Sequence, residues 1–308
     1  MKLSGLLLLG IILAGCSGHP KVMVGKSALK NGAENTARLV EKSTRAVSLH
    51  SDSLSYRPQL QGELQNRAIR EASGLAASRR YEDQLWVLND GGNAPLLYAV
   101  GIDGSDRGEV KISGAKNRDW EDMASFVWDG KPYLLIADIG DNQAKRERCY
   151  LYFVHEPEMP GTVSVPVART IKFIYEDGPR DAESVAVDVP GKRILILTKR
   201  DDPPVLYELP LFPEREGVQI ARRLTSIVGL PQPSLADIFA NPVLGKLGDA
   251  PTAMDISSDG SIAVVMTYRS ILLYERRHGM SWAELFSRPP RKIAAHSLLQ
   301  GEALALAV

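Results

Sequence analysis

The sequence has few of the residue types on which many common functions depend. It contains two cysteines, five histidines and only 6% aromatic residues in 308 positions, and 37 basic side chains balance 37 acidic ones. A net charge of zero gives no general attraction to nucleic acid or anionic lipid. So few aromatic residues also disfavour a stacking surface for single-stranded nucleic acid. Binding to nucleic acid is therefore not expected.

The motifs of several large enzyme classes are also missing. The chain has no GxSxG elbow, HExxH, CxxC pair, GxGxxG loop or P-loop. The histidines are scattered, and none has a partner at the spacing of metal ligands, which favours surface positions over a metal site. These histidines are His19, His50, His155, His278 and His296.

The N-terminal residues have the pattern of a secretory signal. Lys2 precedes an apolar run too short to span a bilayer of roughly 30 Å, and small residues lead into Cys16. This ending resembles the lipobox of bacterial lipoproteins, which implies cleavage before Cys16 and lipid on its sulfur. Ser17 stands where an inner-membrane retention signal would place Asp, so the resemblance implies an outer-membrane lipoprotein facing the periplasm. An ordinary signal peptide with a chance cysteine is the alternative.

The chain divides into three parts of different composition. Residues 1–15 form the predicted signal peptide, and residues 16–52, rich in Ser, Ala, Lys, Asn and Gly, are predicted to be a tether. Residues 53–308 form the predicted domain. Cys149 lies there in the apolar stretch CYLYFV, and we expect it to be a buried, unpaired hydrophobic residue.

Internal repeats decide the predicted fold. Five stretches begin with a polar or acidic residue and continue with alternating small and apolar residues, and each of the first four is followed by a turn and three more strands. The prediction is an all-β protein, a β-propeller of four-stranded blades, with an all-β sandwich as the alternative. The five stretches are EASGLAAS from Glu71, DWEDMASFV from Asp119, RDAESVAVD from Arg180, DAPTAMDIS from Asp249 and QGEALALAV from Gln300.

The fifth stretch is the last one in the sequence, so four blades are recognisable and the fifth is incomplete. We expect this fifth blade to lack its middle strands, and we expect SYRPQLQGELQN, from Ser55, to supply its outer strand. A gap of this kind would leave an exposed sheet edge, which proteins usually avoid. The sequence therefore predicts either a truncated product or a gapped ring. A helical turn is expected from Ser234, in the long insertion before the fourth repeat.

Propeller geometry collects charged residues at one mouth of the central channel, because the start of each first strand lies beside the end of the second. Crowded carboxylates repel one another, so they require either a hard cation such as Ca²⁺ or pairing with basic residues. The acidic residues at the starts of the first strands, called leads below, are Asp119, Glu121, Asp181, Glu183 and Glu302. The residues at or just after the ends of the second strands are Asn89, Asp90, Asp138, Asp141, Asn142, Lys199, Arg200, Asp201 and Arg269. The basic residues available for pairing are Arg118, Arg180, Lys199 and Arg200.

From these residues we select candidate roles. The proposed metal ligands are Glu121, Asp141, Glu183 and Glu302, and Arg180 and Lys199 are candidate contacts for an anionic substrate. Trp120 lies between two acids, where it would either stack on a ligand or pack between blades.

Several phrases together resemble a group of bacterial secreted propellers without an established activity. They are EASGLAAS, LWVLNDGGNAPLLYAV, NRDWEDMASF, YLLIADIGDNQAKR and AESVAVD, and the resemblance runs from about Arg70 to the end. The wider neighbourhood is similar to phytase-like and lactonase-like propellers, which bind calcium with carboxylates at the channel mouth. No catalytic motif can be transferred residue by residue from them.

Two functions follow from these features. The first is a lipid-anchored, monomeric binding or assembly module that recognises an envelope protein through its acidic mouth. The second is a Ca²⁺-dependent hydrolase of a phosphoester, lactone or ester.

Overall fold

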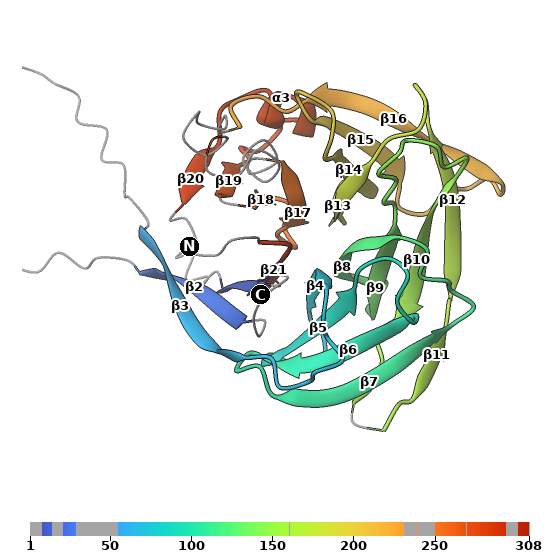
Figure 1. Cartoon of the computed structure of the whole chain (residues 1–308). Helices are drawn as coiled ribbons and strands as arrows, with labels where there is room; N and C mark the ends of the chain where they lie inside the picture. The colour runs from blue at the N-terminus through green and yellow to red at the C-terminus, as the bar shows by residue number, and fades with distance from the viewer. Residues whose placement is uncertain are drawn as a thin grey trace, which may run out of the picture.

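The computed structural model describes residues 8–13, 21–28, 55–159, 161–230, 239, 250–268, 270–293 and 301–307. Nearly all regular structure in these residues is β-strand, and the sheets are arranged around a common centre (Figure 1). No helix in these ranges is both long and apolar enough to cross a bilayer. The prediction of an all-β fold is confirmed.

Each of the first four repeats folds into a sheet of four antiparallel strands. The first repeat comprises β4 (Ala72–Ala77), β5 (Gln84–Asn89), β6 (Leu96–Gly101) and β7 (Asp106–Ser113). The second comprises β8 (Trp120–Trp128), β9 (Lys131–Asp138), β10 (Cys149–His155) and β12 (Arg169–Tyr175). The third comprises β13 (Ala182–Asp188), β14 (Arg193–Thr198), β15 (Val205–Pro210) and β16 (Val218–Ser226). The fourth comprises β17 (Pro251–Ile256), β18 (Ile262–Thr267), β19 (Ile271–Glu275) and β20 (Arg291–Ile293).

Burial changes from the first strand of a repeat to the last, as the sequence pattern predicts. Every residue of β4 and of β17 is buried, because these innermost strands are covered on both faces. The outermost strand β12 alternates between exposed and buried positions, so only one of its faces contacts the interior. A strand buried on both faces is apolar or small throughout, whereas a half-buried strand alternates.

The innermost strands form a closed cycle. β4 contacts β8, β8 contacts β13, β13 contacts β17, β17 contacts β21 (Ala303–Ala307), and β21 contacts β4. Buried carboxylates join these strands, because each accepts backbone N–H groups from a neighbour. Asp122 on β8 accepts from Val185 N at 2.8 Å and from Met254 N at 3.4 Å, and Asp255 on β17 accepts from Leu306 N at 2.8 Å. A cycle of strands with sheets extending outward is propeller architecture.

The last sheet corrects the sequence prediction. Its order is β21, β1 (Leu8–Leu13), β2 (Lys21–Ala28) and β3 (Ser55–Glu63), all antiparallel. The outer strand is β3, as expected, but β1 and β2 fill the middle positions that were predicted to be vacant. The apolar run of β1 had been interpreted only as part of a signal peptide, and β2 lies within the predicted tether. A short apolar run fits a buried strand equally well, so periodicity alone could not separate the two.

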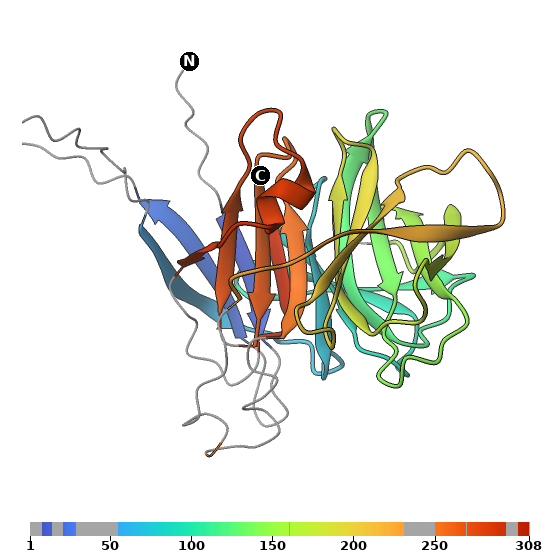
Figure 2. The ribbon, with the colours of Figure 1, turned by 90° about the horizontal axis from the view of Figure 1, so that it is seen from above.

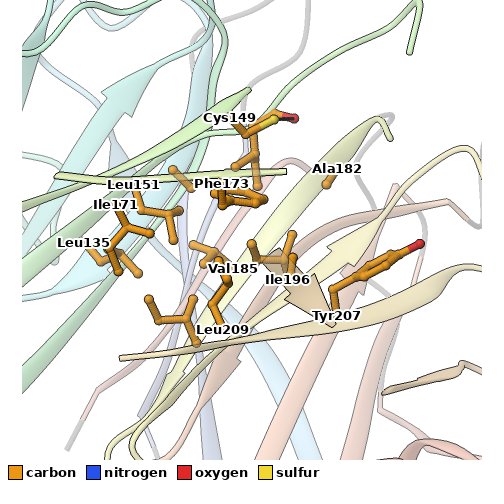
Figure 3. Packing of buried hydrophobic residues seen from close by; sticks show 14 of the residues in the cluster. Leu135, Cys149, Leu151, Ile171, Phe173, Ala182, Val185, Ile196, Tyr207 and Leu209 are labelled. Atoms are coloured by element: carbon orange, nitrogen blue, oxygen red, sulfur yellow. Dashed lines mark hydrogen bonds between the residues drawn. The ribbon is translucent and has the colours of Figure 1, made fainter. Parts of the chain in front are cut away.

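Hydrophobic cores lie between neighbouring sheets. In Figure 3, Leu151, Ile171 and Phe173 of one repeat meet Val185 and Ile196 of the next. Cys149 lies in this core with 3% of its surface exposed and no disulfide, which confirms the expectation for this residue. Burial raises the pKa of its thiol to about 12, so the thiol stays protonated and unreactive.

The rim contains elements that the repeats did not predict. Parallel pairing of β12 with β16, and of β11 (Ser164–Pro166) with β7, joins the outer edges of neighbouring sheets. The short helix α3 (Trp282–Phe286) begins at a capping box of Ser281 and Glu284 and lies near the edge of the molecule (Figures 1 and 2). The helical turn predicted from Ser234 falls outside the described residues.

Candidate cation site at the channel mouth

A repeated backbone irregularity positions the side chains at the mouth. In β4, β8, β13 and β17 the pairing register shifts near the start of the strand, at Ser73, Glu121, Glu183 and Thr252 respectively. A β-bulge leaves one residue out of the ladder and redirects its side chain. Two of the four bulged residues carry hydroxyl groups that donate to the neighbouring innermost strand or its lead. Ser73 Oγ donates to Glu121 O at 2.6 Å, and Thr252 Oγ1 donates to Gly301 O at 2.7 Å.

Three carboxyl groups converge at this mouth. One oxygen each from Asp90, Asp119 and Glu121 lies within 4.8 Å of the other two. Ca²⁺ binds oxygen at about 2.3–2.6 Å, so two ligands of one ion lie at most about 5 Å apart. The three residues therefore fit a single cation, with remaining ligands from water or backbone carbonyls. We call this group the mouth triad.

Two glycines permit the triad to close. A Cβ atom at Gly91 would overlap Asp119 Oδ1, and one at Gly140 would overlap Glu121 Oε1 and Asp119 Oδ2. Each glycine follows the end of a second strand, in the stretches NDGG and DIGDN. Both are therefore required for close approach of the backbone to the carboxylates. The site is a cradle formed by two loops around the carboxylate of Asp119.

The triad is electrostatically strained. Burial raises the pKa of Asp90 and of Asp119, and it raises the pKa of Glu121 well above its usual value; neighbouring carboxylates add to all three shifts. Two like charges about 4 Å apart repel by roughly 4 kcal/mol at an effective dielectric constant of about 20. No basic side chain of the described residues forms an ion pair with any of the three. A bound cation would remove this repulsion.

Lys199 lowers the pKa of Asp90 and of Glu121, but it is already paired with another carboxylate. Its Nζ lies 2.5 Å from Glu183 Oε1 and 5.1 Å from the centre of the Tyr268 ring. Burial alone would lower the pKa of Lys199, yet Glu183 and Tyr268 together outweigh burial and raise it. Burial raises the pKa of Glu183 to about 7 against the opposing effect of Lys199. Lys199 and Glu183 thus lie together at the mouth as an ion pair.

Glu302 is the fourth predicted ligand. It is half-buried at the lead of β21, and burial, with repulsion from Glu183, raises its pKa to about 7. Lys199 lowers the pKa of Glu302, which places this carboxyl group in the same electrostatic cluster. It remains outside the triad.

Two other carboxylates near the triad are neutralised, as the ion-pair alternative expected. Asp138 pairs with Arg146 at 2.7 Å, and Asp181 pairs with Arg200 at 2.6 Å. Asp141 was predicted to be a metal ligand, but its Oδ2 accepts the N–H of Arg146 at 2.7 Å within its own loop. Asp141 therefore organises the loop and does not join the triad.

Two predicted substrate contacts also lie elsewhere. Arg180 pairs with Asp177 at 3.2 Å and Asp201 at 3.7 Å, and it lines a separate cavity of about 200 Å³. Trp120 is fully buried, and its Nε1 donates to Lys116 O at 2.9 Å. Its indole has no free face for a ligand, so the assignment of Trp120 to substrate binding is wrong and the packing alternative holds.

Sequence reasoning placed Asp90 and Asp119 at the mouth but did not select them as ligands. The signal that would have selected them is the glycine after the second strand in two consecutive repeats. Arg146 was also missed, because it lies in a loop beyond the repeated pattern. Arg269 and Cys16 fall outside the described residues.

No protein-family model matches this chain, and no curated protein matches it. Many solved structures match it, and the three that follow match across most of its length. A crystal structure of a nidogen–laminin complex is 10% identical with a TM-score of 0.46, and the match covers 99% of both chains. A putative 6-phosphogluconolactonase from Bacteroides uniformis is 12% identical with a TM-score of 0.38, covering 94% of this chain and 68% of that one. The periplasmic gluconolactonase of Pseudomonas aeruginosa is 14% identical with a TM-score of 0.37, covering 96% and 69% respectively. At such identities a match says nothing about the chemistry of a site.

Proposed function

We propose that the chain is a five-bladed β-propeller whose acidic mouth binds a divalent cation and serves as a cation-dependent binding module. The observation that supports this most strongly is the mouth triad, in which Asp90, Asp119 and Glu121 converge without a basic partner among the described residues. The closed cycle of β4, β8, β13, β17 and β21 supports the number of blades.

The chemistry of the triad favours a hard cation. All three ligands are carboxylates, which suit Ca²⁺ and Mg²⁺, whereas zinc sites are usually built with cysteine or histidine. Ca²⁺ tolerates an irregular set of six to eight oxygens, and Mg²⁺ demands a near-octahedral set. A cradle with three carboxylates and space for water or carbonyl ligands fits Ca²⁺ better.

Binding of Ca²⁺ would change what the mouth presents to a partner. Without a cation, the mouth is a cluster of carboxylates whose repulsion is only partly relieved by Lys199 and Arg146. With a cation, open coordination positions can accept carboxylate or carbonyl oxygens from an envelope protein. Partner binding would then depend on Ca²⁺ and be reversed by a chelator.

Calorimetry with Ca²⁺ tests this proposal. We expect wild-type protein to bind one Ca²⁺ with a dissociation constant between about 1 μM and 1 mM. Asp119→Asn should weaken binding at least tenfold. Asp201→Asn is the matched control, since Asp201 follows the second strand of another repeat and pairs with Arg180, and it should bind normally. If wild type gives no binding heat and no Ca²⁺-dependent stabilisation, the proposal is wrong.

Hydrolysis of a phosphoester, lactone or ester is the second candidate, and Glu302 favours it. A carboxyl group with a pKa of about 7 can accept a proton near neutral pH, as a general base must. A cation at the triad would polarise a substrate or activate water. Glu302→Gln should then abolish turnover of a chromogenic ester or phosphoester panel while Ca²⁺ still binds. No turnover by Ca²⁺-loaded wild type would exclude this candidate and leave the binding module intact.

We also propose that Cys16 is lipidated and anchors the protein to the outer membrane. The lipobox-like ending supports this proposal, and cleavage before Cys16 would remove β1 from the last sheet. The two assignments therefore exclude each other in the mature protein. Mass spectrometry of protein purified from the envelope should find an acylated N-terminal cysteine. An intact N-terminus retaining residues 8–13 would contradict the lipid anchor and favour β1 as a permanent strand.

A further inference from the structure

The end of the channel opposite the mouth contains a cavity of about 540 Å³. Residues at the far ends of β4, β8, β13 and β17 line it, together with the turns that follow. Its volume lies within the range of small-molecule sites, which is about 300–1,000 Å³. The mouth triad lies at the other ends of these same strands, so the two sites are spatially separate.

The walls of this cavity are largely apolar, and they include Arg79, whose charge also lowers the pKa of the buried Asp255. The apolar residues include Phe126, Val187 and Ile256. The Arg79 guanidinium donates from Nε and Nη2 to Ser125 O, at 3.2 and 2.9 Å. No carboxylate of the described residues forms an ion pair with Arg79, and no acceptor among them reaches its Nη1. Its neighbour Arg80, by contrast, pairs with Glu158.

A buried donor beside the cavity lacks a partner. Gln84 lines the cavity with 3% of its surface exposed, and its Nε2 has no hydrogen-bond acceptor. Buried donors are normally satisfied, and leaving one unpaired is costly. Arg79 therefore provides the charged donor of an apolar enclosure, and the amide of Gln84 would have to rotate to add a neutral one. Glu82, also in the lining, is exposed and belongs to the rim.

We propose that this cavity binds a small carboxylate with an aliphatic or aromatic body. The carboxylate would accept hydrogen bonds from the Arg79 guanidinium, and the apolar body would lie against Phe126, Val187 and Ile256. An arginine presents donors in a planar geometry that suits a carboxylate. This site is independent of the cation site, since it uses no residue of the mouth triad.

Calorimetry with octanoate and 3-phenylpropionate tests the assignment. At least one should bind wild type with 1:1 stoichiometry, and 1-octanol, which has no charge, should bind at least tenfold more weakly than octanoate. Arg79→Gln should weaken carboxylate binding at least tenfold. Arg222→Gln is the matched control, because Arg222 is an exposed arginine paired with Glu176 on the outer sheets, and it should bind normally.

A second variant keeps the test decisive if Arg79→Gln unfolds the protein. Ser258 lines the cavity but is exposed, so Ser258→Trp should fill the cavity without disturbing the core and should abolish binding. The proposal is overturned if neither carboxylate binds wild type at millimolar concentration. It is equally overturned if 1-octanol binds as well as octanoate, or if Ser258→Trp binds like wild type.

Discussion

The two ends of the channel are built from the same strands but differ in chemistry. At the mouth, bulged residues and second-strand ends bring carboxylates together against one paired lysine. At the far end, the same strands finish in apolar residues, with the guanidinium of Arg79 beside them. One end gathers carboxylates, and the other combines apolar walls with a basic side chain. The difference shows that the direction of a strand, as well as its pattern, determines what a propeller channel can bind.

The largest expected effect is a loss of Ca²⁺ affinity at the mouth with no loss of carboxylate affinity at the far end. The double variant Asp119→Asn with Glu121→Gln removes two of the three charged ligands, so Ca²⁺ affinity should fall by more than a hundredfold. Octanoate affinity should stay within twofold of wild type, because the far cavity shares no residue with the triad. Calorimetry with both ligands on the same preparation checks this. Parallel loss of both affinities would show that the ends are not independent.

The next effect concerns Asp122, which lies between the two ends. Its carboxyl group accepts N–H bonds from Met123, Val185 and Met254, and burial raises its pKa well above the usual value despite those bonds. Asp122→Ala leaves buried N–H groups unsatisfied and should cost about 2–5 kcal/mol of stability. Asp122→Asn keeps an acceptor oxygen and should cost much less. Denaturant unfolding measures both, and equal losses would mean that the hydrogen bonds are unimportant.

A smaller effect is expected from Gly140→Ala, which tests the cradle alone. The added Cβ would displace the carboxylates of Glu121 and Asp119 while leaving every ligand present. Ca²⁺ affinity should fall about tenfold, which corresponds to about 1.4 kcal/mol. The melting temperature in a chelator should change little. Unaltered Ca²⁺ affinity would show that close packing against Gly140 does not shape the site.

The last expected effect is on the pH dependence of stability. The folded-state pKa of Glu302 is about 7, above its unfolded value near 4.3, so the folded protein binds more protons than the unfolded chain between these values. Stability in a chelator should therefore be highest at low pH within this window and fall as pH rises from about 4.5 to 7. Ca²⁺ should offset the loss at pH 7.5 and have little effect at pH 5. Thermal melts at both pH values, with Ca²⁺ and with EDTA, measure this.

The sequence predicted the fold well because the innermost strands repeat a recognisable pattern. A polar lead followed by small and apolar residues is dictated by burial on both faces, so β4, β8, β13, β17 and β21 could be aligned by eye. The N-terminal strand β1 could not be predicted, because an apolar run fits both a signal peptide and a buried strand. Its pairing with β21 depends on contacts between the two ends of the chain.

The candidate site was predicted in location but only partly in membership. Glu121 belongs to the triad, whereas Glu183 is neutralised by Lys199 and Asp141 is turned into its own loop. Such distinctions depend on bulges and on the path of short loops, which strand periodicity does not encode. The far cavity was not predicted at all. Arg79 and Gln84 both line the cavity because the chain turns between β4 and β5.

Anomalous diffraction from crystals grown with Tb³⁺, a luminescent and strongly scattering substitute for Ca²⁺, would test the central claim most directly. The account predicts one dominant peak at the mouth, about 2.5 Å from oxygens of Asp90, Asp119 and Glu121. That peak should decrease when Ca²⁺ competes. Crystals that show no peak at the triad, or peaks only at exposed carboxylates elsewhere, would contradict it.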